Sequence, residues 1–151
     1  MELKDFIKPE FIKMELASQD KKGVIEELVQ VLEDNNVIFD REIVLNGVME
    51  REKKGTTGVG NGVAIPHVKS NAVKKPAIVF GKSRKGIEYE SLDGKPAYLF
   101  FLIAVPEESD NQHIKLLSTL SRMLVHEDFR EALSKADTPA AIREVVRRYK
   151  K

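Results

Sequence analysis

The chain has 151 residues, a length typical of one domain with a substantial buried core. Its 25 Lys and Arg residues nearly balance its 24 Asp and Glu residues, and the formal net charge of +1 argues against partners such as nucleic acid or an anionic membrane surface. The sequence contains no Cys, which excludes disulfide bonds, thiolate nucleophiles and Cys-based zinc sites.

No segment predicts direct insertion into a membrane. The longest apolar run, residues 97–105, is much shorter than the ~20 residues that a membrane-spanning helix needs. Residues 1–5 lack the basic-then-apolar order of a secretory signal. There is also no internal repeat or low-complexity linker. We therefore expect a cytoplasmic protein with a single domain over residues 1–151.

The first part of the chain predicts one strand followed by two helices. Residues 11–16 alternate apolar and charged side chains, as a half-buried strand does. Ser18 is a candidate N-cap for a helix that runs to about residue 35. Asp40 is expected to cap a second helix that reaches Arg51 or slightly further and ends near Gly55. The first helix has apolar side chains at helical spacing: Val24, Ile25, Leu28, Val29 and Leu32.

The middle of the chain predicts the strands of the sheet. Residues 63–65 form a short strand that Pro66 ends. Residues 77–81 and 86–90 are expected to pair as a hairpin, and the dense apolar run at residues 98–105 indicates a central strand.

The last third predicts helices. A helix is expected to begin at Asp110, residues 127–136 favour a second one, and Thr138 with Pro139 supplies the cap and first residue of the last. Strands and helices mix without regular βαβ alternation, which favours an α/β fold with a mixed β-sheet flanked by helices on both faces over a strictly doubly wound fold. The first of these helices has the apolar stripe Leu116, Leu117, Leu120, Met123 and Leu124.

The most informative segment is GTTGVGNGVAIPH, residues 55–67. Glycine lets backbone N–H groups turn toward an anion, because it lacks a Cβ and can adopt positive φ. A histidine near neutral pH keeps a lone pair for nucleophilic attack. His67 behind such a loop indicates phosphate chemistry, although an ordinary loop histidine is an equally good interpretation. Pro66 restricts the backbone before His67 and so favours one ring orientation.

Other side chains can be assigned to the same site, each with a structural alternative. Arg51 can bind phosphoryl oxygens through its planar fork, or it can belong to a solvated charged helix face. His113 precedes Leu116 by one turn, so its ring points inward and is either a second imidazole beside His67 or a core histidine bonded to backbone. Thr56 and Thr57 can donate hydroxyl hydrogens to an anion, or they are ordinary turn residues.

Competing motifs do not fit. The glycine spacing differs from the dinucleotide-binding fingerprint and precedes a strand where that fingerprint precedes a helix. The Gly-Lys-Ser/Thr ending of a nucleotide P-loop is missing. The three histidines are not at metal-ligand spacing. We expect neither a metal nor a cofactor.

Residues 51–67 resemble the phosphorylation-site motif of the fructose/mannitol-type enzyme IIA proteins of the bacterial phosphoenolpyruvate:sugar phosphotransferase system, a family that includes nitrogen-regulatory IIA proteins. The segment DNQHIKLLSTL, residues 110–120, is similar to the second histidine segment of that family. The resemblance implies a mixed sheet between helices. It implies that His67 accepts a phosphoryl group from the phosphocarrier HPr and passes it to a IIB component, with Arg51 and His113 as companions in the site.

Further expectations follow from this resemblance. Thr56, Thr57 and Gly58 would supply hydroxyl and N–H donors to the phosphoryl oxygens. IIB components of this class resemble cysteine phosphocarriers, and the absence of Cys here predicts a IIB partner on a separate chain, with a membrane IIC permease as an indirect partner.

Three functions remain open. The first is a IIA phosphocarrier of sugar uptake. The second is a nitrogen-type regulator in which phosphorylation controls binding to a target protein. The third is an anion-binding domain without phosphoryl transfer.

Overall fold

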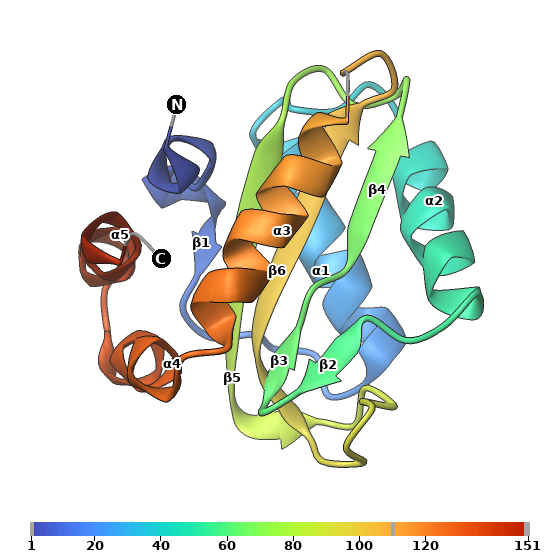
Figure 1. Ribbon diagram of the computed structural model, residues 1–151. Helices are drawn as coiled ribbons and strands as arrows, with labels where there is room; N and C mark the ends of the chain where they lie inside the picture. The colour runs from blue at the N-terminus through green and yellow to red at the C-terminus, as the bar shows by residue number, and fades with distance from the viewer. Residues whose placement is uncertain (1, 110, 150–151) are drawn as a thin grey trace.

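The computed structural model describes residues 2–109 and 111–149, which fold as a mixed sheet with helices on both faces, as the sequence predicts (Figure 1). The strand order is β1-β5-β6-β3-β2, and β4 also pairs with β6. The strands are β1 (Ile12–Lys13), β2 (Gly58–Gly60), β3 (Val63–Ala64), β4 (His67–Ser70), β5 (Ala77–Ile87) and β6 (Ala97–Pro106). The helices are α1 (Lys21–Asp34), α2 (Arg41–Lys53), α3 (Gln112–Leu124), α4 (Glu127–Lys135) and α5 (Pro139–Arg148), with short 3-10 turns η1 (Leu3–Phe6) and η2 (Pro9–Phe11).

The helix caps agree with the sequence at two of three predicted positions. Asp40 caps α2 by accepting from the N–H of Ile43, and Thr138 caps α5. The predicted Ser18 cap is wrong: Asp20 accepts from the N–H of Gly23 and begins α1 two residues later. The predicted start at Asp110 lies outside the described residues, and α3 begins at Gln112.

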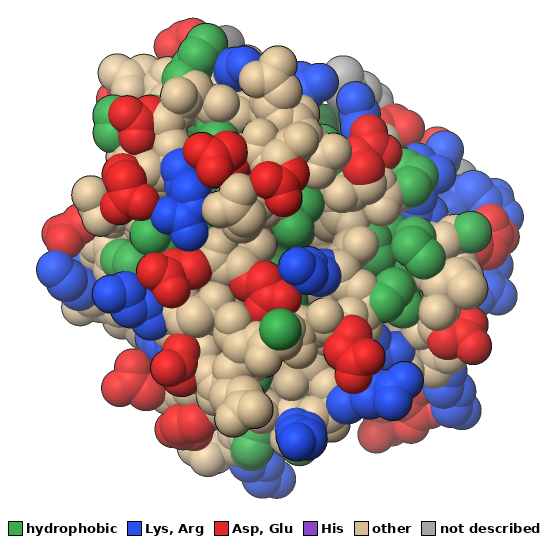
Figure 2. Space-filling view, turned by 180° about the vertical axis from the view of Figure 1, so that it is seen from behind, with side chains coloured by type: hydrophobic (Ala, Val, Ile, Leu, Met, Phe, Trp, Pro, Cys, Tyr) green, Lys and Arg blue, Asp and Glu red, His purple; other side chains and the backbone are tan. Residues whose placement is uncertain are grey.

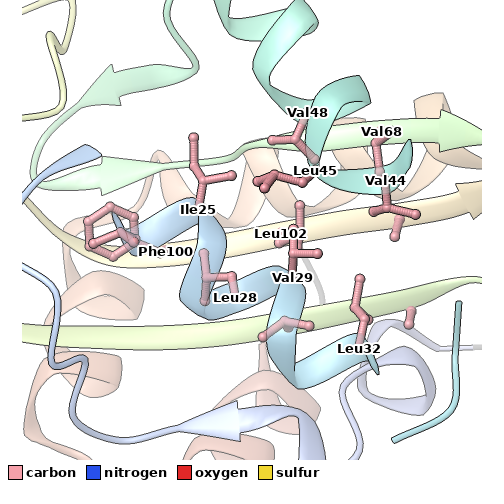
Figure 3. Close-up of a cluster of buried hydrophobic side chains, with 14 of the residues drawn as sticks. Ile25, Leu28, Val29, Leu32, Val44, Leu45, Val48, Val68, Phe100 and Leu102 are labelled. Carbon is pink, nitrogen blue, oxygen red and sulfur yellow. The ribbon is translucent and has the colours of Figure 1, made fainter. Parts of the chain in front are cut away.

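The central strand β6 separates two hydrophobic cores. Alternate side chains of a strand point to opposite faces, so each apolar residue of β6 contributes to one core. In Figure 3 the side chains of α1 and α2 point toward Phe100 and Leu102 of β6 and toward Val68 of β4. The opposite face of the sheet packs against α3, α4 and α5 through residues such as Phe101, Ile103, Leu120, Phe129 and Ile142.

The predicted hairpin over residues 77–81 and 86–90 is wrong, because one continuous strand, β5, occupies residues 77–87. Gly81 is no turn residue: a Cβ there would lie 2.8 Å from Cδ2 of Leu28, so glycine gives α1 room to approach the strand. Gly86 has a φ of 86° beside the ring of Tyr98, where the register with β6 shifts. The first strand is also shorter than residues 11–16, because η2 includes Phe11 and the chain bends at residues 14 and 15, directly after Lys13.

The glycine-rich segment contains more strand than its sequence predicts. Residues 58–60 form β2, which pairs antiparallel with β3. Pro66 ends β3, but its carbonyl accepts from the N–H of Ile103, and the chain resumes pairing with β6 as β4. His67 is therefore the first residue of an edge strand and not a loop residue.

The surface opposite the view of Figure 1 has no large field of a single charge. Figure 2 shows acidic and basic side chains intermixed on that side and no histidine among them. Within residues 2–109 and 111–149, none of the helices has both the length and the apolar character needed to span a membrane.

Candidate functional site

The ring of His67 is held by its own backbone neighbourhood. Its Nδ1 lies 3.0 Å from the carbonyl oxygen of Ile65. A carbonyl oxygen only accepts, so Nδ1 carries the hydrogen and the neutral ring has its lone pair on Nε2. In the register of β4 with β6, His67 lies opposite Ile103, so its side chain is on the face of the sheet that α3 covers. The geometry thus orients one nucleophilic nitrogen.

The surroundings of the half-buried His67 keep it neutral. Burial lowers the pKa of His67 below its ordinary value of 6.5, and the positive charge of Arg51 lowers it further. The hydrogen bond to Ile65 and the negative charge of Glu52 raise the pKa, but together they are outweighed by burial and Arg51. The lone pair of His67 is therefore available near neutral pH.

Arg51 lies in the last turn of α2, half-buried, and its charge acts on His67. Its Nη1 donates to the carbonyl oxygen of Gly55 at 2.8 Å. This hydrogen bond links the guanidinium to the turn that follows the helix. A guanidinium has five N–H donors in a plane. The arrangement can therefore hold the fork in place through one donor and offer others to an anion near His67.

His113 lies in the first turn of α3 and is half-buried, as its place on the apolar stripe predicts. Burial lowers the pKa of His113, the positive charge of Lys69 lowers it further, and so does His67 when it is protonated. Its Nδ1 is buried and has no hydrogen-bond partner within the described part of the chain. Arg51 on α2 and His113 on α3 thus each lie near enough to His67 on β4 for electrostatic interaction with it.

Thr56, Thr57 and Gly58 use their donors inside the protein. The hydroxyl of Thr56 donates to the carbonyl of Tyr89 and accepts from the N–H of Gly58. Both the N–H and the hydroxyl of Thr57 donate to the carboxylate of Glu52. Close packing requires glycine at position 58, because a Cβ there would overlap the hydroxyl of Ser91. Direct contact of these groups with phosphoryl oxygens stays a prediction, and it requires these bonds to rearrange.

Two charged residues near the site do not follow from the motifs. Lys69 is two residues after His67 on β4, so it shares the face of His67 and acts on His113. Glu52 is buried, although its charged neighbours predict a solvated face. A signal for Glu52 exists: it continues the buried series Val44, Val48 at a spacing of four residues.

Residues 5–149 match the family model described as phosphoenolpyruvate-dependent sugar phosphotransferase system, EIIA 2. A fructose-specific EIIA component of Haloferax volcanii is 42% identical over 137 residues, which cover 91% of this chain and 89% of that protein. A fructose-specific EIIABC component of Bacillus subtilis is 39% identical over 151 residues, which cover all of this chain and 24% of that protein. The chain thus spans about a quarter of the length of the Bacillus relative.

A solved structure gives the same result for the fold. The nitrogen regulatory protein IIA-Ntr of Neisseria meningitidis superposes with a TM-score of 0.89 at 29% identity, over 95% of this chain and 98% of that chain. The match over residues 5–149 and the identity to the Haloferax protein establish that the chain belongs to the fructose/mannitol-type EIIA family of the phosphoenolpyruvate-dependent sugar phosphotransferase system.

Proposed function

We propose that the chain is a phosphocarrier that accepts a phosphoryl group from HPr on Nε2 of His67 and passes it to a fructose/mannitol-class IIB component. The bond from His67 Nδ1 to Ile65 is the observation that carries the proposal, because it leaves Nε2 as the nucleophile. Burial, which lowers the pKa of His67, supports the same role.

The chemistry is an in-line exchange of one bond to phosphorus for another. The Nε2 lone pair of His67 forms the new N–P bond while the bond from phosphorus to the donor histidine of HPr breaks and returns its electron pair to that nitrogen. The transition state is loose, so the protein contributes mainly orientation and stabilisation of charge on the oxygens. Arg51 is suited to that stabilisation, since its guanidinium matches phosphoryl oxygens. His113 supplies a second, neutral ring beside His67.

The protein returns to its unphosphorylated form when the same exchange transfers the phosphoryl group from His67 to a second acceptor. A IIB component would attack phosphorus from the side opposite Nε2, and His67 would recover its lone pair. The 151 residues contain no Cys, so a cysteine acceptor must come from outside them.

Phosphorylation with phosphoenolpyruvate, enzyme I and HPr tests the proposal. We expect a mass increase of one phosphoryl group that is lost in acid, and no increase in His67→Ala. His126→Ala is the matched control, because His126 lies at the start of α4 and takes no part in the site. An unmodified wild-type protein would contradict the proposal and favour an anion-binding domain.

A nitrogen-type regulator is the second candidate, favoured by the similarity to the Neisseria nitrogen regulatory protein. In that case His67 would still be phosphorylated, but the output would be binding to a target protein. Onward transfer separates the two functions: we expect a purified fructose- or mannitol-type IIB domain to discharge the phosphorylated protein. Failure with every such IIB domain would favour the regulator.

A further inference from the structure

Glu52 is a buried carboxylate directly after Arg51. Only 3% of its side-chain surface is exposed. A carboxylate removed from water is costly unless hydrogen bonds and an opposite charge replace its hydration. Its burial at the end of α2 therefore calls for partners.

Four groups fill the hydrogen-bonding capacity of this carboxylate. Oε1 accepts from the N–H of Thr57 at 3.1 Å and lies 3.0 Å from Nζ of Lys21. Oε2 accepts from the hydroxyl of Thr57 and from that of Tyr89 at 3.2 Å. Lys21 also lies over the ring of Tyr89, 4.7 Å from its centroid. One side chain thus ties the first residue of α1, the end of α2, the turn before β2 and the segment after β5.

These contacts constrain the residue before Glu52. Successive helix residues point about 100° apart, so holding Glu52 inward fixes the rotation of the last turn of α2 and the direction of Arg51. Arg51 in turn donates to Gly55, inside the turn that Glu52 holds through Thr57. We propose that Glu52 is a positioning residue of the His67 site, whose buried carboxylate holds the end of α2 and residues 54–57 so that Arg51 is presented to His67.

This inference rests on the proposed phosphoryl transfer. Glu52 acts through other residues, because both of its oxygens are occupied within the protein. Its charge has a separate consequence at His67. Arg51 lowers and Glu52 raises the pKa of His67. Lys21 from α1 and the phenol of Tyr89 contact Glu52 itself, and Lys69 from β4 acts on His113 of α3. Neutralising Glu52 alone therefore moves the pKa of His67 downward.

Glu52→Gln tests the inference, because it keeps the shape of the side chain and removes its charge. We expect a folded protein and a lower pKa of His67 by NMR titration. Transfer from phospho-HPr is expected to slow about tenfold, less than the ~100-fold that a misplacement of about 1 Å can cost. Glu50→Gln is the matched control: it removes the same charge two residues earlier from an exposed side chain. We expect neither its transfer rate nor its His67 pKa to change.

A thermodynamic cycle with Arg51→Ala identifies the route of the effect. If Glu52 acts through Arg51, then Glu52→Gln slows transfer much less in the Arg51→Ala background than in the wild type. Equal slowing in both backgrounds would overturn the positioning role.

A folded Glu52→Gln variant with wild-type transfer rate and His67 pKa would also overturn it, while phosphorylation of the wild type on His67 would leave the proposed function intact. Conversely, the pKa of His67 is measured without any partner, so it reports on Glu52 even if HPr fails as donor. Should Glu52→Gln not fold, Tyr89→Phe removes one donor to the same carboxylate. Transfer at the wild-type rate in Tyr89→Phe would then count against the inference.

Discussion

Gly47 of α2 lies directly against Val68 of β4. A Cβ on Gly47 would be 2.7 Å from Cγ2 of Val68, closer than two carbon atoms can approach. The missing side chain lets α2 pack closely on the strand that begins with His67, and Arg51 follows Gly47 by one helical turn on the same face. The distance between the helix carrying the guanidinium and the strand carrying the imidazole is thus set by one glycine.

Gly47→Ala is expected to lower the free energy of unfolding, although alanine is the better helix former by about 1 kcal/mol. Overpacking costs about 1–3 kcal/mol, and the β-branched Val68 has little rotamer freedom to move aside. Urea unfolding measures the change, and transfer from phospho-HPr is expected to slow with it. Asn46→Ala, at an exposed neighbouring position, serves as control. A Gly47→Ala protein more stable than the wild type would contradict the packing argument.

Arg51→Lys is expected to slow phosphoryl transfer while the protein stays folded. Lysine keeps the positive charge but loses the planar fork, and loss of one charge-stabilising donor slows related reactions about 100-fold or more. A quenched time course with phospho-HPr measures the transfer rate, and circular dichroism shows whether the protein is folded. Unchanged rates would remove Arg51 from the site.

His113→Ala is expected to impair transfer with only a modest loss of stability, about 1 kcal/mol. The substitution removes the packing contacts of the half-buried ring, but it breaks no hydrogen bond of the buried Nδ1, which has no partner within the described residues. The two effects are separated by measuring the transfer rate and urea unfolding on the same preparation. A loss of stability with full transfer activity would identify a purely structural histidine.

The free energy of unfolding is expected to fall as the pH drops below the ordinary histidine pKa of 6.5. The native pKa values of His67 and His113 are both lowered, so in this window the unfolded chain binds more protons than the folded one. This contribution to stability is fully present above pH 6.5 and is lost as the pH falls through the lowered native pKa values of His67 and His113. Urea unfolding at several pH values should show a smaller slope in His67→Gln/His113→Gln. An identical slope would exclude these two residues as the cause.

Lys82→Met is expected to destabilise the protein without affecting transfer. Nζ of Lys82, on β5, donates to the carbonyl of Ala136 at 2.8 Å and to those of Leu133 and Ser134, so it closes the carboxyl end of α4. Loss of these charged hydrogen bonds costs about 2–3 kcal/mol. Thermal unfolding measures the loss, with the exposed Lys85→Met as control. Equal stability of the two variants would show that the cap contributes little.

Local signals predicted most of the fold. The caps at Asp40 and Thr138, the apolar stripe of α3 and the dense run of β6 each depend on residues a few positions apart, and each is confirmed. The glycines misled the prediction at β5. Gly81 resembles a turn residue in sequence, but glycine is needed there because Leu28 of α1, more than fifty residues earlier, packs against it.

Residue patterns alone were enough to identify the family, to locate the helix boundaries to within a few residues and to select Arg51, His67 and His113 as candidates. The roles of these three residues stay predictions, although Arg51 and His113 each lie near enough to His67 for electrostatic interaction with it. Three features became evident only in the folded chain: Glu52 is buried, Thr57 is hydrogen-bonded to it, and His67 begins a strand. The physical reason is that burial and hydrogen bonding depend on partners brought from far along the chain, such as Tyr89, 37 positions from Glu52, and no local pattern records such partners.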